Sequence, residues 1–218
     1  MTMNMIVKST LGCVGLATLM LLGGCTTATV YTAEEFSTYQ EEHKIVAILP
    51  YSVHIELKKL PEGTTEADIR EMESDEGLMF QRILYGQFLE QYSKRRYTVE
   101  FQDIDKTNTL LTRSDIDFGN MTKYTKDELA AVLGVDALIS GHIKRDKPMS
   151  TAAAIWSTVL IGVGNTNQVH VSMAVHDGAT GKLLWSYDND VGGGLGSSPE
   201  KLAKSLMDQI SKKFPYEP

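Results

Sequence analysis

Five histidines are the side chains of this 218-residue chain best suited to metal binding or proton transfer. They are scattered, and none shows the His-x-x-x-His or His-Glu-x-x-His spacing of a zinc site on a helix. His170 and His176 share one face of an expected strand, but roughly 20 Å of strand separates them. The set therefore predicts no metal centre: His43, His54, His142, His170 and His176.

Candidate nucleophiles and phosphate loops are equally weak. A serine nucleophile in a sharp turn needs Gly-x-Ser-x-Gly, and Gly196-Ser197-Ser198 lacks the second glycine. The glycine-rich stretch 192–196 precedes an expected helix and could cradle an anion there, but it lacks the Gly-Lys-Ser/Thr of a nucleotide loop. A plain loop is the preferred interpretation. Carboxylates are plentiful but no pair is singled out, so we expect no enzyme and no cofactor.

Cysteine chemistry gives the strongest signal. Residues 1–24 have the parts of a secretory signal: a short start with Lys8, an apolar core over Leu11–Leu22, and two glycines. The apolar run is too short for a membrane span, which needs about 20 residues. Its ending, Leu-Gly-Gly before Cys25, resembles the lipobox of bacterial lipoproteins. The alternative is an ordinary signal peptide that happens to contain a cysteine.

The lipobox resemblance implies a diacylglycerol on the sulfur of Cys25 and a further acyl chain, such as palmitate, on its amine. Two or three chains hold a protein firmly on a membrane. Thr26, where an aspartate would retain the protein, implies the outer membrane and its periplasmic face. Cys13 leaves with the signal peptide, so no thiol remains for a disulfide, a nucleophile or a metal.

The composition of the mature chain narrows its partners. The full 218 residues less the 24 of the signal peptide leave 194, enough for one domain with a real core. The formal charge of −7 becomes −8 when Lys8 is removed. A net acidic chain argues against nucleic acid as a partner, because phosphate contacts need clustered Lys and Arg.

The polar, acidic run that ends at His43 predicts a tether over residues 25–43, lipidated at Cys25 as the lipobox resemblance implies. Hydrophobic periodicity predicts an α/β domain over residues 44–218. Ile45–Leu49 is a continuous apolar run stopped by Pro50, which is typical of a strand buried on both faces. Glu66–Arg95 predicts a long helix whose first third is acidic and poorly packed.

The middle of the chain predicts a parallel βα unit. Tyr97–Ile104 is an expected strand, and Asp105–Ile116 contains a short helix. Thr125-Lys-Asp-Glu is a capping-box pattern, Gly134 ends the helix that follows, and Val135–Gly141 comes at once as a buried strand.

The last third of the chain predicts an antiparallel hairpin and a closing helix. Apolar residues alternate over Val169–Val175 and Leu183–Tyr187, around the turn Asp177–Lys182. Ser197 is the expected cap of a final amphipathic helix. Together these elements predict a single domain of two or three layers, with a mixed sheet.

Ala152–Gly164 is an uncharged stretch that fits none of these elements. It is too short to span a membrane as a helix but long enough for a transmembrane strand of about 9–11 residues. A buried helix or a flap packed on the sheet is the favoured interpretation, and a surface for a partner or a membrane is the alternative. Under that alternative the contact residues are Ile155, Trp156, Val159, Leu160 and Ile161.

Three pieces in this order resemble a group of envelope lipoproteins: Val46–Pro50, Glu128–Gly141 and Asp177–Trp185. The group includes the curli secretion channel, the penicillin-binding-protein activators and a family of uncharacterised (DUF799-like) lipoproteins. Their shared domain is similar to the N-terminal domain of TolB. The resemblance implies a TolB N-terminal-like fold and a role in binding partners or forming an oligomeric pore.

The sequence thus predicts a non-enzymatic, lipid-anchored periplasmic protein that binds another envelope component. Trp156 is its expected anchor residue, since Trp is favoured at interface hot spots. The first alternative is a homo-oligomeric secretion pore or ring of the curli-channel type. The second is a periplasmic hydrolase, which would require a polar pocket with clustered carboxylates or histidines.

Overall fold

The strand β2, Ile45–Ile48, is buried on both faces of the sheet from Val46 onward, as its unbroken apolar run predicts, while Ile45 at its start is 39% exposed. Val46 and Ile48 join one hydrophobic cluster, while Ala47 and Leu49 join a second cluster on the opposite face. The computed structural model describes residues 28–57, 60, 62–145, 169–191, 199–210 and 213–218. The sheet at β2 is therefore a middle layer between two sets of helices.

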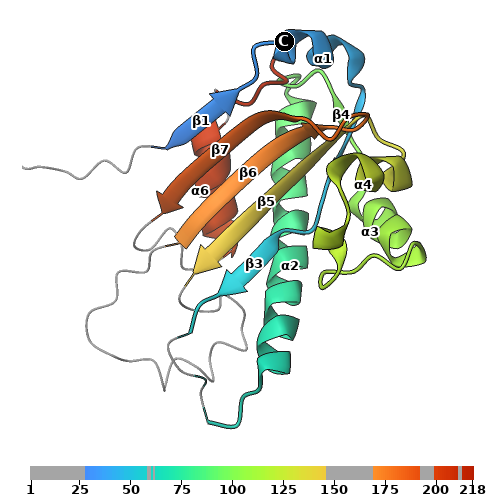
Figure 1. Ribbon diagram of the computed structural model, residues 1–218. Coiled ribbons are helices and arrows are strands. Elements are labelled where there is room, and N and C mark those ends of the chain that lie inside the picture. The colour runs from blue at the N-terminus through green and yellow to red at the C-terminus, as the bar shows by residue number, and fades with distance from the viewer. Residues whose placement is uncertain (1–27, 58–59, 61, 146–168, 192–198, 211–212) are drawn as a thin grey trace, which may run out of the picture.

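Seven described strands form one open, mixed sheet in the order β1-β7-β6-β5-β2-β4, with β3 pairing with β5 beyond the end of β2 (Figure 1). β2, β3 and β4 run parallel to β5, whereas β6, β7 and β1 are antiparallel to their neighbours. The predicted α/β class with a mixed sheet is confirmed. The strand bounds are β1 Thr29–Thr32, β3 Ser52–Ile55, β4 Glu100–Phe101, β5 Ala137–Arg145, β6 Val169–Asp177 and β7 Leu183–Val191.

One face of the sheet is covered by α2, Glu66–Ser93, and α6, Pro199–Ile210. Phe80, Leu84 and Phe88, spaced four apart along α2, are fully buried, whereas Tyr92 at the next step of this spacing is 38% exposed. The acidic first part packs better than the sequence predicts, since Ile69 and Glu76 are buried. A Cβ at Gly77 would lie 2.2 Å from the carbonyl oxygen of Tyr51, so the missing side chain lets the helix approach the backbone.

Among the described elements, the other face is covered only in part. Its cover consists of α3, Ile104–Arg113, and α4, Lys126–Leu133, with the 3₁₀ turn η1, Met121–Lys123, between them. The predicted capping box of α4 is confirmed: Thr125 N–H donates to Glu128 Oε2 at 2.8 Å. Gly134 ends this helix with a φ of 64°, in the left-handed region that favours glycine. No helix in the described ranges is both long and apolar enough to cross a membrane.

Most of the stretch predicted as a tether is folded. β1 pairs with the hairpin strand β7, and α1, Phe36–Glu42, follows it. Phe36 is buried, with its ring edge-on to Tyr216 at 5.3 Å. Tyr31, Phe36 and Tyr39 are spaced too irregularly to predict this helix from the sequence. The helix is fixed instead by the contact of Phe36 with Tyr216 at the far end of the chain. The expected strand Tyr97–Ile104 is also shorter than predicted, since Asp103 already caps α3.

Candidate functional site

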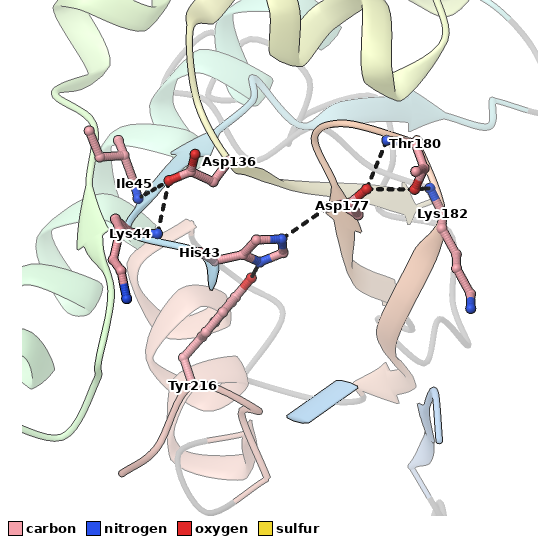
Figure 2. Close-up of polar contacts among 8 residues, drawn as sticks. All are labelled: His43, Lys44, Ile45, Asp136, Asp177, Thr180, Lys182 and Tyr216. Carbon is pink, nitrogen blue, oxygen red and sulfur yellow. Dashed lines mark hydrogen bonds and ion pairs between the residues drawn. The ribbon is translucent and has the colours of Figure 1, made fainter. Parts of the chain in front are cut away.

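His43, between α1 and β2, lies at the centre of a buried polar array (Figure 2). Its Nδ1 lies 2.6 Å from the Tyr216 hydroxyl, and its Nε2 lies 3.0 Å from Asp177 Oδ1. Because an ionised carboxylate only accepts, Nε2 donates to Asp177, and in the neutral ring Nδ1 accepts from Tyr216. Only 3% of His43 is exposed. The array joins three segments that are far apart in sequence.

Asp177, the last residue of β6, also organises the hairpin turn. Its Oδ2 accepts from the backbone N–H of Thr180 at 2.8 Å and from the Thr180 hydroxyl at 2.5 Å. Burial opposes ionisation of this carboxyl, but the hydrogen bonds from Thr180 and His43 outweigh it and hold the pKa of Asp177 below its usual value. An ionised aspartate is therefore built into the turn.

Asp136 plays the matching role at the start of β2. Its Oδ2 accepts from the backbone N–H groups of Lys44 at 2.8 Å and Ile45 at 2.9 Å, while its carbonyl accepts from Gly178 N–H at 2.7 Å. Between these anchors lies an open cleft of about 320 Å³, lined by Glu42, His43, Ala130, Ala131, Gly134, Val135, Asp136, Asp177, Gly178 and Ala179.

The Asp177–His43–Tyr216 order has the form of an acid–base relay, but it lacks an accessible reacting group. Tyr216 is fully buried, and burial raises the pKa of its hydroxyl well above the usual range. A nucleophile needs both a lowered pKa and access to substrate. The array is therefore a structural latch, joining the N-terminal helix, the hairpin turn and the C-terminus.

The face of the sheet opposite α2 and α6 is polar over β5, β6 and β7. Register places Lys144 beside His170 and His170 beside Asp190 on this open face. His170 contacts Asp190 at 3.1 Å and Asp188 at 3.3 Å. The sheet thus brings four histidines that are scattered in the sequence onto one face: His54, His142, His170 and His176. The alternation of apolar and polar residues along each strand was the sequence signal that could have predicted this shared face.

Metal binding finds no support in this histidine face. Across the part of the chain that the structure describes, no three His, Cys, Asp or Glu residues are grouped so that they could hold a metal ion.

The residues predicted for lipidation and contact lie outside the described ranges: Cys25, Ile155, Trp156, Val159, Leu160 and Ile161. Their flanking strands are described. Arg145 pairs with Val169, and Val169 pairs with Val191, so β5 ends, β6 begins and β7 ends at one edge of the domain. β1 begins at this same end, because Thr29 pairs with Asp188 near the end of β7.

Comparison with known proteins gives only loose likenesses. No family model and no curated protein matches this sequence. A PelC dodecamer from Paraburkholderia phytofirmans is 14% identical with a TM-score of 0.37, covering 88% of this chain and 96% of its own. Lipoprotein GNA1162 from Neisseria meningitidis is 14% identical with a TM-score of 0.40, covering 78% and 96%.

A third likeness is the LpoB C-terminal domain from Salmonella enterica, 11% identical with a TM-score of 0.32, covering 68% of this chain and 82% of its own. The neighbours thus include a protein described as a lipoprotein. Likenesses at these TM-scores are too distant to carry an argument about function.

Proposed function

We propose that this protein is a non-enzymatic lipoprotein of the bacterial envelope, anchored through Cys25 at the periplasmic face of the outer membrane. Its α/β domain binds another envelope protein at the end of the sheet that faces the bilayer. The contact is made by Ala152–Gly164, with Trp156 at its centre.

The direction of the strands is the observation that carries this proposal. β5 ends at Arg145 and β6 begins at Val169, so the uncharged segment leaves and re-enters the domain at one end of the sheet. β1 begins at that same end with Thr29. The lipidated residue and the uncharged segment therefore attach to the same end of the domain.

The folded N-terminus makes this placement tight. A tether of 18 extended residues would reach roughly 60 Å, but β1 begins only four residues after Cys25, which allows at most about 14 Å. A short link of this kind holds the domain against the membrane and raises its effective concentration toward partners there. The segment then meets lipid or a protein lying on it.

The non-enzymatic part of the proposal is supported by how His43 is used. It is the histidine whose partners most resemble a catalytic relay. Both of its ring nitrogens are hydrogen-bonded to buried side chains, Nδ1 to Tyr216 and Nε2 to Asp177. The polar side chains His170, Asp188 and Asp190 are spread over the neighbouring strands β6 and β7.

A photo-crosslinking amino acid at Trp156 tests the proposal in the intact envelope. The matched control carries the same group at Ala179, an exposed residue in the hairpin turn at the opposite end of the sheet. We expect one discrete protein adduct from position 156 that is lost when Cys25→Ser removes the anchor, and none from position 179. Equal labelling from both positions would contradict the placement.

The mass of the lipidated protein separates this role from a secretion pore. A monomer, or a complex with one different protein, supports the proposal. A ring of several copies of this chain, crosslinked to each other through position 156, would replace it with the oligomeric role.

A further inference from the structure

A crevice lies beyond the carboxyl end of β2, away from the latch and from the membrane-facing end of the sheet. Two adjoining cavities, of about 180 Å³ and 60 Å³, share Pro50, Phe118 and Met121 in their walls. The larger is mostly apolar, with Leu78 of α2 and Leu111 of α3 in its lining. The smaller reaches the middle of β5 and is polar there, with Ser140 and His142 in its lining.

Topology favours this position for a ligand. The chain leaves β2 and β3 for α2 on one face, whereas after β4 it passes to α3 and α4 on the other face. In open α/β sheets, ligands bind in the crevice beyond the carboxyl ends of parallel strands where the helices change faces. Pro50 follows β2 at this point and lines both cavities.

The smaller cavity has a cationic side chain that the described protein does not neutralise. Lys126, at the start of α4, lines it and is half-buried. Among the described residues no carboxylate lies within ion-pair distance of Lys126, although the chain as a whole carries a formal charge of −7. Burial lowers the pKa of Lys126, as expected for a charge without a counter-ion.

The charge of Lys126 also affects the pKa values of His142 and His176. Burial first, and then the charge of Lys126, lower the pKa of both rings. The Lys126 ammonium group, with the Ser140 hydroxyl and the His142 ring in the same lining, offers donors and positive potential to an anion that enters the crevice.

We propose that this crevice binds an aliphatic carboxylate: Lys126 pairs with the carboxylate, Ser140 and His142 donate to it, and the chain of the ligand lies between Leu78, Leu111, Phe118 and Met121. A carboxylate fits better than a phosphate, since one ammonium and two neutral donors match a single charge. The site is independent of the proposed function, because Ser140, Gly141 and His142 lie at the middle of β5 and not at its membrane-facing end.

Titration calorimetry on the full lipidated chain in phosphatidylcholine nanodiscs tests the site, with empty nanodiscs as the blank. Hexanoate is the probe, hexanol removes its charge, and acetate removes its apolar body. We expect hexanoate to bind and the other two to bind at least about tenfold more weakly, the worth of one charge-assisted hydrogen bond or of two buried methylenes.

Variants assign the binding to the crevice. Lys126→Met should weaken hexanoate binding about tenfold or more, and His142→Leu should weaken it less. Lys144→Met removes an equal charge from an exposed position of the same strand, outside the crevice, and should leave binding unchanged. Circular dichroism verifies that each variant is folded. Equal binding of hexanoate and hexanol, or full binding by Lys126→Met, would overturn the proposal.

Discussion

The two halves of the sheet differ in how many faces the helices cover. β2 and the start of β5 lie between α2 on one face and α3 and α4 on the other, and Ala47 and Leu138 are fully buried there. Among the described elements, helices cover β6 and β7 on one face alone, and the other face of these strands carries histidines and aspartates. The number of covered faces explains the strand sequences. A strand with helices on both faces is apolar throughout, and a strand with helices on one face alternates apolar and polar residues.

The border between the halves falls inside one strand. β5 begins with Ala137, Leu138 and Ile139, all fully buried, and beyond α4 its open face becomes polar with His142 and Lys144. The crevice lies at this border, where α4 ends its cover and a polar strand face meets an apolar wall. The first part of β5 thus contributes to the core, and the part that follows it contributes to the proposed binding site.

Leu138→Ala should show the largest contrast between the halves. Its side chain is fully buried under α4, so truncation leaves a cavity and costs about 2–5 kcal/mol of the free energy of unfolding. The matched change Ser172→Ala, on the open face of β6, should cost less than about 0.5 kcal/mol. Urea unfolding followed by circular dichroism measures both. Similar costs for the two would mean that α4 does not cover Leu138 as described.

Asp177→Asn tests the latch that joins the hairpin of the open half to the start of β2. It removes charge-assisted bonds to Thr180 and His43 and should cost about 1–3 kcal/mol at pH 7. The folded pKa of Asp177 is depressed, so this stabilisation is present above the unfolded pKa of about 3.9 and is lost as pH falls through the folded pKa.

The gap between wild type and Asp177→Asn should therefore close below about pH 4. Asp188→Asn changes the same charge at an exposed position and should leave stability almost unchanged at both pH values. A gap that persists in acid would show that Asp177 acts through packing alone.

Local patterns predicted much of this architecture. The run Ile45–Leu49, the capping box at Thr125 and the hairpin around Asp177–Lys182 each carry their signal within a few residues. The latch could not be predicted, because His43, Asp177 and Tyr216 come together only when the first and last segments of the domain pack. The crevice could not be predicted without the topology either, because Lys126 and His142 belong to different elements that only the fold brings together.

His176→Leu tests how strongly a polar side chain is buried at the border between the halves of the sheet. His176 pairs with Leu138 in the sheet, and burial, followed by the charge of Lys126, lowers its pKa to about 4. Between about pH 6.5 and pH 4 the ring is protonated in the unfolded state, where its pKa is near 6.5, but stays neutral in the folded state. This residue therefore lowers the free energy of unfolding as pH falls through that range. Relative to wild type, the variant should gain about 1 kcal/mol at pH 5, because the ring keeps some contact with water.

Chemical denaturation at pH 7 and pH 5 gives that difference directly. The informative quantity is the change between the two pH values, since replacing the ring alters packing equally at both. A variant whose stability falls with pH as steeply as wild type would place the titration on another residue.

The smallest effect should come from His170→Ala, at the centre of the open half. Its ring is 41% exposed, and its partners Asp188 and Asp190 are more exposed still. Ion pairs at such positions contribute between about 0 and 1 kcal/mol and are screened by salt, so we expect a loss below about 0.5 kcal/mol at pH 6 that vanishes in 0.5 M NaCl. A salt-independent loss above 2 kcal/mol would show that another part of the protein covers His170, and that the two halves are equally buried.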